Sequence, residues 1–226
     1  MQIAIDTSND IASIALTRDG AIISEMTWRC GQNHTVELYA RLDFLVHQSS
    51  LELPQVNCIF VALGPGSFNG LRVGVSAAKG LALSLGIPIV GINTLEICAY
   101  PHASSGLPIC VVQNAGREEV AAAFYRNLRT GWKNTKPEEL IKLDDLILKI
   151  KEKTIFCGDF DPATAIQIKK QGKGLAIIPS FSVRLRRAGV LAELGMKRFE
   201  MRLFDNLETL QPVYLRKPPI TERKKA

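Results

Sequence analysis

The sequence predicts an α/β protein made of two successive domains. Three observations support this prediction: a meander of short apolar strands opens the chain, helical and apolar segments follow it in turn, and a second meander begins near residue 108. Prolines, serines and a glycine gather between 100 and 108, where we expect the junction. The predicted domains are 1–103 and 104–226, each a mixed sheet with a leading meander and flanking helices, the second smaller and less regular.

Hydrophobic periodicity orders the elements of the first domain. An alternating run opens the chain, a turn at Arg18-Asp19-Gly20 joins two further strands, and a stripe of leucines marks the first helix. An almost wholly apolar strand then leads into a glycine-rich helix that ends at Gly86. We expect strands at 2–6, 11–16, 21–28, 58–63 and 87–92, with helices at 34–49 and from just after 67 to 86.

The second domain shows the same order of elements less clearly. Apolar runs predict strands at 108–112, 120–125 and 154–157, and the spacing of leucine and isoleucine predicts a helix from 137 to 150. Further helix is expected before a basic segment that starts at Arg184.

Composition predicts an ordinary globular protein of the cytoplasm. With 226 residues and 46% hydrophobic content, the chain can bury roughly 70% of its unfolded surface. The first residues have the alternating pattern of a strand and not the basic and apolar regions of a secretory signal peptide, so we expect no export. No uncharged apolar run approaches the roughly 20 residues that a membrane span needs. The cysteines lack a Cys-x-x-Cys spacing, so we expect reduced core residues at Cys30, Cys58, Cys98, Cys110 and Cys157.

Net charge is uneven along the chain. Residues 1–100 hold five Lys or Arg and eight Asp or Glu, a balance of −3, so the remainder carries +9 to give the total of +6. Arg184, Arg186 and Arg187 are therefore candidate contacts to a nucleic-acid backbone. The alternative is a solvated surface, which the lack of interleaved aromatic residues near the chain end favours. A second basic group crowds that end: Arg216, Lys217, Arg223, Lys224 and Lys225.

The helix after Ser67 has one face almost free of side chains. Every fourth position from Gly70 is Gly74, Ala78 and Ala82. Because glycine costs a helix interior about 1 kcal/mol relative to alanine, packing must stabilise this helix. We interpret the ridge as a docking surface that lets another helix approach closely. The alternative is that the ridge packs inside its own domain.

The same helix carries a polar stripe. Arg72, Ser76 and Lys79 lie three and four positions apart, which indicates that one side meets water or a partner. The hydroxyl of Ser67 is expected to cap the helix, because Gly-x-Gly-Ser lacks the spacing of a nucleophile elbow. Phe68 is expected to be a core anchor or a docking side chain.

Three segments of the chain closely resemble one protein family. They are Ile3-Ala4-Ile5-Asp6-Thr7-Ser8, the run Leu63-Gly64-Pro65-Gly66-Ser67-Phe68-Asn69-Gly70-Leu71-Arg72-Val73-Gly74 with Ala78-Lys79-Gly80-Leu81-Ala82, and Pro212-Val213-Tyr214-Leu215-Arg216. They resemble the bacterial TsaB family, also called YeaZ, densely over about 1–127 and thinly from there to 210. The resemblance implies a two-domain actin-like ATPase (ribonuclease H-like) fold and a role in making threonylcarbamoyladenosine next to the anticodon of tRNAs.

The resemblance also implies partners. TsaB-like proteins act as a platform for the catalytic paralogue TsaD, with TsaE as a third, ATP-dependent member, and alone they form homodimers through much the same surface. We expect tRNA to be reached through this complex and no membrane to be involved. The family's docking elements fall on helix 34–49 and on the helix after Ser67. The implied interface residues are Leu38, Leu42, Leu45, Ser67, Phe68, Gly70, Arg72, Gly74, Ala78, Leu81 and Ala82.

The resemblance further bears on catalysis. ATPases of this superfamily hold nucleotide phosphates and Mg²⁺ between two hairpins that each present a carboxylate. Asp6, Thr7 and Ser8 match the first hairpin, but the second has Asn114 where relatives usually have an aspartate, and an amide brings no negative charge to a metal. We therefore expect a vestigial phosphate site in a non-catalytic scaffold without a cofactor of its own, ATP or ADP binding only at an interface with partner subunits.

The alternative is an enzyme. A small-molecule kinase or ATPase acting alone would use Asp6 together with Asp159 or Asp161. Motifs for other kinds of site are absent from the sequence. It has no His-x-x-x-His pair to bind a metal and no Gly-Lys-Ser/Thr after the glycines to make a Walker phosphate loop. The third glycine of a dinucleotide-binding fingerprint is displaced.

Overall fold

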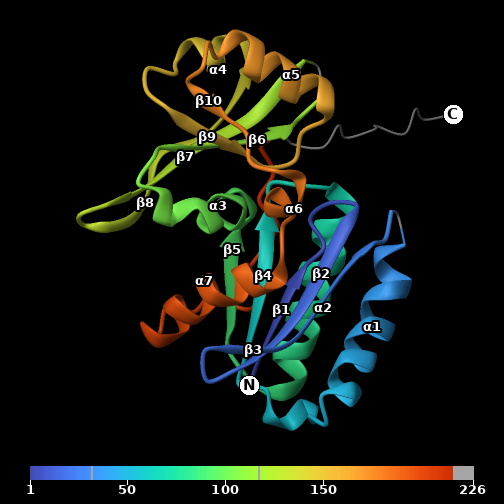
Figure 1. Cartoon of the computed structure of the whole chain (residues 1–226). Helices are drawn as coiled ribbons and strands as arrows, with labels where there is room; N and C mark the ends of the chain where they lie inside the picture. Colours follow the sequence, from blue (N-terminus) through green and yellow to red (C-terminus); the bar gives the residue numbers. More distant parts are fainter. Residues whose placement is uncertain (32, 117, 216–226) are drawn as a thin grey trace, which may run out of the picture.

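Two five-stranded mixed sheets of the same topology form the two halves of the molecule (Figure 1). The computed structural model describes residues 1–31, 33–116 and 118–215. In each sheet an antiparallel meander of three strands is followed by two strands that add in parallel on the other side of the first strand. This repeat confirms the predicted α/β class and its two rounds of one arrangement.

The strand orders are β3-β2-β1-β4-β5 and β10-β9-β6-β7-β8. The first sheet consists of β1 (Gln2–Asp6), β2 (Ile11–Arg18), β3 (Ala21–Arg29), β4 (Cys58–Gly64) and β5 (Ile89–Asn93). The second consists of β6 (Ile109–Asn114), β7 (Glu119–Leu128), β8 (Gly131–Lys142), β9 (Thr154–Cys157) and β10 (Ala176–Ile177). Every strand expected from the sequence is present within a few residues of its expected bounds, and β8 and β10 are additional.

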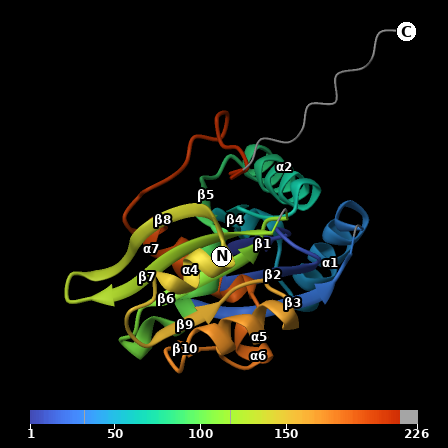
Figure 2. The same cartoon turned by 90° about the horizontal axis from the view of Figure 1, so that it is seen from above.

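Helices cover both sheets in layers (Figures 1 and 2). They are α1 (His34–Gln48), α2 (Phe68–Leu85), α3 (Thr94–Ala99), α4 (Leu143–Leu148), α5 (Pro162–Gln171), α6 (Phe181–Arg184) and α7 (Ala188–Glu200), with short 3-10 turns at Leu53–Gln55 and Tyr100–Ser105. One core joins α1 and α2 to the first sheet and another joins α7 to its opposite face. In the second half, α4 and α5 share a core with one face of the sheet and α3 with the other.

The segment from α7 to residue 215 returns to the first sheet, which corrects the expected division at residue 104. Leu191 and Leu194 of α7 are buried in the core that contains Phe60 of β4. Beyond α7, the backbone amide of Asp205 donates to the Ile89 carbonyl and that of Val213 to the Leu63 carbonyl. The first domain therefore takes in α7 and the segment up to 215, because the apolar face of α7 fits the face of the sheet that α1 and α2 leave open.

The helix expected from 137 to 150 is mostly wrong. The chain continues β8 as far as Lys142, and only Leu143–Leu148 is helical. Pro137 sits inside β8, where it is tolerated because β8 is the edge strand of its sheet. The apolar residues from Leu140 onward therefore belong to two elements, and their helix-like spacing across the boundary is a coincidence of sequence.

The ridge on α2 faces its own sheet, which overturns its interpretation as a docking surface. A Cβ atom at Gly70 would overlap the carbonyl oxygen of Thr7, and one at Gly74 would overlap Thr7 Oγ1. Ala78 and Ala82 are equally buried. The small side chains bring α2 close to the end of β1, so the alternative of packing inside the domain is correct.

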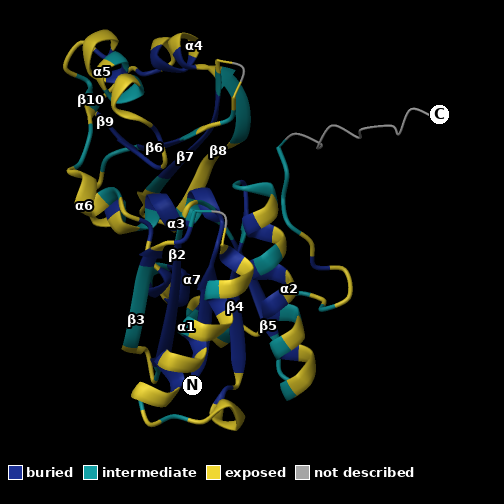
Figure 3. Cartoon of the chain, turned by 90° about the vertical axis from the view of Figure 1, so that its right-hand side faces the viewer, coloured by how far each residue is buried: buried dark blue, intermediate teal, exposed yellow. Residues whose placement is uncertain are grey.

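The leucines of α1 that were expected to contact a partner also pack inside their own domain. Leu38, Leu42 and Leu45 are buried in the core of the first domain. What α1 and α2 leave exposed is the opposite side, visible as yellow bands along both helices (Figure 3). Within the described residues no helix is long and apolar enough to cross a membrane.

Candidate functional site

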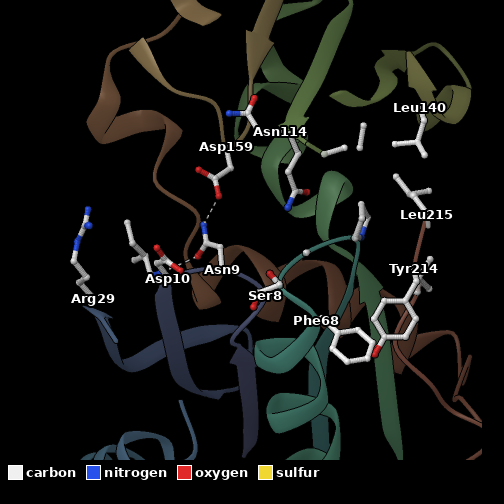
Figure 4. Close-up of a pocket in the computed structure, with 18 residues that line it drawn as sticks. Ser8, Asn9, Asp10, Arg29, Phe68, Asn114, Leu140, Asp159, Tyr214 and Leu215 are labelled. Carbon is white, nitrogen blue, oxygen red and sulfur yellow. Dashed lines mark hydrogen bonds between the residues drawn. The ribbon is translucent and has the colours of Figure 1, made fainter. Parts of the chain in front are cut away.

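A cleft of about 970 Å³ lies between the two domains. Most of its lining comes from the carboxyl ends of β1, β4, β6 and β9 and the residues that follow them, and the segment after α7 adds Val213, Tyr214 and Leu215. Figure 4 shows side chains from both domains pointing into the same space. The ends of parallel strands are where open α/β sheets bind ligands, so this cleft is the candidate site.

The carboxylate expected to bind phosphate or Mg²⁺ in this cleft is engaged elsewhere. Asp6 is buried, and its Oδ2 lies 2.6 Å from Nε of Arg186. Its other oxygen accepts bonds from the backbone amide of Ser8 at 2.9 Å and the Ser8 hydroxyl at 2.5 Å. Burial by itself lowers the pKa of Arg186, but the Asp6 charge and the Cys98 contact outweigh it and raise that pKa, so the guanidinium stays charged. Asp6 therefore neutralises a buried cation.

The two residues after Asp6 have different roles: Thr7 stabilises the fold and Ser8 lines the cleft. Thr7 Oγ1 donates to the Gly70 carbonyl at 2.7 Å, which fastens β1 to the start of α2. Ser8 lines the cleft, but its hydroxyl is committed to Asp6. The Ser67 hydroxyl accepts from the Gly70 amide at 3.3 Å, which confirms the predicted helix cap.

The second hairpin carries an amide in a structural role. Asn114 lines the cleft, and its Nδ2 donates to Asp161 Oδ2 at 3.2 Å. Asp161 also caps α5 by accepting from the Thr164 amide at 2.7 Å. Hydrogen bonds from Thr164, with a further one from Asn114, lower the pKa of Asp161. Of the two acids considered for an enzyme, Asp161 is thus a helix cap and Asp159 faces the cleft.

Asp159 closes one end of the cleft together with a residue of the first domain. Asn9 Nδ2 donates to Asp159 Oδ2 at 2.8 Å, and Figure 4 shows the two side chains meeting across the gap. Asp10 and Arg29 also line this end. Sequence reasoning missed Asn9, Asp10 and Arg29; the polar turn that follows β1 was the available signal for the first two.

The other end of the cleft is aromatic. The rings of Phe68 and Tyr214 lie 5.2 Å apart between centroids, and the Arg72 guanidinium sits 3.8 Å from the centroid of Phe68. Two buried polar atoms that face no hydrogen-bond partner in the described chain, Gln113 Oε1 and Tyr214 Oη, belong to residues of this lining.

The arginines proposed as nucleic-acid contacts are consumed by other groups. Arg186 is buried against Asp6, Arg187 forms an ion pair with Glu25, and Arg184 stacks 4.6 Å from the ring centroid of Phe160. Arg186 is therefore closed to a nucleic acid, and the contacts expected of Arg184 and Arg187 stay a prediction. The basic group at 216–225 lies outside the described residues.

The exposed side of α1 and α2 is apolar in places. Val36 is 77% exposed, Tyr39 52% and Leu83 73%. A groove of about 540 Å³ lies along α1 and the segment that follows it, lined by Tyr39, Leu42 and Val46 among others, with Leu81 from α2. Elsewhere, within the described ranges, no three His, Cys, Asp or Glu side chains are grouped as metal ligands would be.

Known proteins match the chain over most of its length. A family model described as "TsaD: tRNA N6-adenosine threonylcarbamoyltransferase" matches residues 21–209. The tRNA threonylcarbamoyladenosine biosynthesis protein TsaB of Buchnera aphidicola subsp. Schizaphis graminum is 34% identical over 163 residues, 70% of this chain and 77% of that protein. The protein of the same name from Bacillus subtilis is 34% identical over 152 residues, 67% of this chain and 66% of its own length, which is just under two thirds.

A solved structure shares the fold. YeaZ from Pseudomonas aeruginosa superposes with a TM-score of 0.77 at 20% sequence identity, covering 94% of this chain and 99% of that one. At this identity the likeness establishes the architecture of two actin-like domains.

Proposed function

The chain belongs to the TsaB family, and from that premise we propose that it takes part in making threonylcarbamoyladenosine in tRNA as a non-catalytic scaffold subunit. Its catalytic partner would be a TsaD protein, the paralogue whose family model also fits this chain, with TsaE as the third member. The complex would act in the cytoplasm, and tRNA would reach this subunit as part of it.

The observation that carries the non-catalytic role is the ion pair between Asp6 and Arg186. A carboxylate that must hold Mg²⁺ and phosphate has to face the ligand with its charge available. Asp6 instead compensates a buried guanidinium, and Asn114 supplies an amide where the opposite hairpin would need a charge. Both positions thus support the fold and give a nucleotide little electrostatic grip. We propose that this subunit has no cofactor of its own and that ATP or ADP binds at an interface with its partners.

A second candidate is an ATPase or small-molecule kinase acting alone. Two carboxylates at the polar end of the cleft, Asp10 and Asp159, are the observation in its favour. The purified chain without partners distinguishes the two: sustained ATP hydrolysis that is lost in Asp159→Asn supports the enzyme, whereas turnover that needs added TsaD and TsaE supports the scaffold.

The partner surface of the scaffold is proposed on the outward side of α1 and α2. The inward leucines of α1 that the sequence favoured are buried in the core, but Val36 and Tyr39 on α1 and Leu83 on α2 are exposed, and Tyr39 also lines the groove. Large apolar side chains in contact with water beside a groove favour docking of an apolar partner. The same surface would pair two copies of this chain when TsaD is absent.

The test compares two leucines of equal exposure. Leu83 on α2 is 73% exposed and Leu148 on α4 is 72% exposed. Leu83→Glu is expected to abolish co-purification with TsaD and to convert a dimer into a monomer in size-exclusion chromatography, whereas Leu148→Glu is expected to leave both unchanged. Normal pairing by Leu83→Glu would refute this surface, and failure of the wild-type chain to bind TsaD at all would refute the scaffold.

A further inference from the structure

We propose that a strip of basic side chains on the second domain binds the phosphate backbone of RNA directly. This basic strip consists of Arg126, Arg129, Lys133 and Lys136 on the β7–β8 hairpin, with Lys151 and Lys153 on the loop between α4 and β9. The choice of RNA as the polyanion rests on the proposed function; the strip itself rests on charge and geometry.

The two segments that carry the strip have the same net charge as the whole chain. Segments 126–136 and 149–153 contain seven Lys or Arg and one Glu, a balance of +6. The complete chain has 28 Lys or Arg and 22 Asp or Glu, so the remaining 21 of each sign cancel. Such a one-sided concentration attracts a polyanion, because each cation that neutralises a phosphate releases a condensed counterion.

The two segments are neighbours in space. Arg126 Nη1 lies 3.0 Å from Oε1 of Glu152, which joins the hairpin to the α4–β9 loop. Glu139 is occupied by Lys149 at 2.7 Å, and Glu138 accepts from Asn93 at 2.7 Å. Glu152 and Glu139 are therefore paired with cations, and Glu138 is held by an amide on the side of α3.

Within the described chain, the remaining cations are uncompensated. Arg129, Lys133, Lys151 and Lys153 are exposed and form no ion pair with a described residue. Lys136 makes a contact of 4.8 Å with the ring centroid of Phe124, which leaves its charge without an acidic partner.

Strand register places two of these cations face to face. Arg126 on β7 is directly opposite Lys133 on β8. Like charges at opposed positions destabilise an antiparallel pair, and Glu152 answers only one of the two. A phosphate bound between Arg126 and Lys133 would relieve the repulsion. The pair therefore makes the protein less stable without RNA and favours the complex with RNA.

The hairpin presents the strip rigidly. Side chains alternate across a strand, so Trp132 lies on the face opposite Lys133. The Trp132 ring stacks on Tyr125 at 5.5 Å and meets Tyr100 edge-on at 5.4 Å, and its Nε1 donates to Glu96 at 3.2 Å. Figures 1 and 2 both show the hairpin projecting from the side of the second domain. The cations are thus held out on an anchored arm.

An acidic protein surface is the rival occupant. Protein interfaces usually bury an apolar centre inside a polar rim. Among the described residues of the hairpin tip, Leu128 at 42% exposure is the one exposed large apolar side chain, and Trp132 is partly buried by its aromatic contacts. A row of cations with so little apolar surface suits a phosphate backbone better.

The test measures binding of a labelled, unmodified tRNA transcript to the full chain by fluorescence anisotropy between about 50 and about 200 mM salt. The wild-type protein is expected to bind with an affinity that falls steeply with salt. Arg129→Glu/Lys133→Glu is expected to weaken binding at least about tenfold and to lower the salt slope by about two. The control Arg18→Glu/Arg202→Glu makes the same change in net charge on the surface of the first domain and is expected to keep most of the affinity.

A stability measurement separates binding from a structural role. Lys133→Glu replaces the like-charge pair with Arg126 by an attractive one. The variant is therefore expected to melt at the same or a higher temperature than the wild type while losing RNA affinity. A lower melting temperature together with unchanged RNA affinity would show that Lys133 serves the fold.

Two results would overturn the inference: equal losses of RNA affinity in the double variant and its control, or no salt-dependent binding by the wild-type chain. If the wild type binds no RNA and the double variant also loses TsaD pairing, the strip is a protein-docking surface. Because TsaD pairing is measured separately through Leu83, failure of RNA binding leaves the scaffold proposal standing, and the reverse also holds.

Discussion

Asp6 and Arg186 are 180 positions apart in the sequence and form a buried ion pair, with Arg186 Nε 2.6 Å from Asp6 Oδ2. The pair joins the end of β1 to the segment just before α7. It therefore ties the returning end of the chain to the first strand of the first sheet. A second contact, from Arg186 Nη1 to Cys98 Sγ at 3.7 Å, adds α3 to the same junction.

Breaking this pair on one side is expected to be costly. Arg186→Met leaves the Asp6 carboxylate buried without its cation, so we expect the free energy of unfolding to fall by about 3–5 kcal/mol. The matched change Lys149→Met breaks an ion pair with Glu139 whose two side chains are 40% and 42% exposed, and it is expected to cost less than about 1 kcal/mol. Urea unfolding followed by circular dichroism measures both. Equal losses would mean that the buried pair has no special weight.

Two glycines on α2 are expected to respond to alanine in opposite directions. A Cβ at Gly74 would overlap Thr7 Oγ1, whereas one at Gly80 meets nothing within 4 Å. Gly74→Ala should therefore destabilise the first domain, and Gly80→Ala should stabilise it by up to about 1 kcal/mol through helix propensity. Thermal melting of the two variants beside the wild type provides the check. A tolerated Gly74→Ala would show that α2 can move away from β1.

The contrast between these glycines also explains where sequence reasoning succeeded and failed. Glycine and alanine at every fourth position correctly indicated a close backbone approach on α2. Periodicity cannot say which surface makes that approach, because the end of β1 and a partner helix place the same steric demand on Gly70 and Gly74. Local patterns also predicted most strands correctly, because the alternation of a strand and the turn that follows it depend on residues close together in the sequence.

The site was harder to predict because its decisive contacts are non-local. Asp6 and Arg186 were each singled out from the sequence, one for phosphate and one for nucleic acid, and nothing in either segment shows that they neutralise each other. The basic strip was missed for a related reason. Arg126 and Lys133 become neighbours only through the register of β7 and β8, and the helix expected from 137 obscured the second half of that hairpin.

Buried thiols are expected to make the protein sensitive to alkali. Burial raises the pKa of Cys58 from 9.0 to about 12 and raises the pKa of the other four cysteines as well. Between pH 9 and about 12 the Cys58 thiol loses its proton in the unfolded chain and keeps it in the folded protein, and the other four thiols shift in the same direction. Stability is therefore complete below pH 9 and falls above it, by on the order of 1 kcal/mol per pH unit for each fully buried thiol.

Urea unfolding at a series of pH values above 9 tests this dependence. Cys58→Ala is the matched variant: it loses some stability at every pH through the missing sulfur, but its decline with pH should be shallower than that of the wild type by one thiol. Parallel declines would show that Cys58 does not contribute. At pH 8 the folded protein is expected to resist alkylation at all five cysteines, which are buried, and to react fully once unfolded.

Trp132 is expected to hold the β7–β8 hairpin in place. Its ring meets Tyr100 edge-on outside the hairpin and stacks on Tyr125 of β7, so it ties the hairpin to the rest of the molecule and also joins its two strands. Such aromatic pairs contribute about 0.5–1.5 kcal/mol each. Trp132→Ala should therefore lower the free energy of unfolding by about 1–3 kcal/mol. It should also release the hairpin locally, so that trypsin cleaves after Arg129 or Lys133 at concentrations that leave the wild type intact.

Trp132→Phe keeps a stacking ring but loses the hydrogen bond to Glu96, and it is expected to resist trypsin almost as the wild type does. Mass spectrometry of the early fragments identifies the cleaved bonds. Two outcomes would mean that the aromatic contacts of Trp132 do not anchor the hairpin: first cleavage elsewhere in Trp132→Ala, or equal trypsin sensitivity of the alanine and phenylalanine variants.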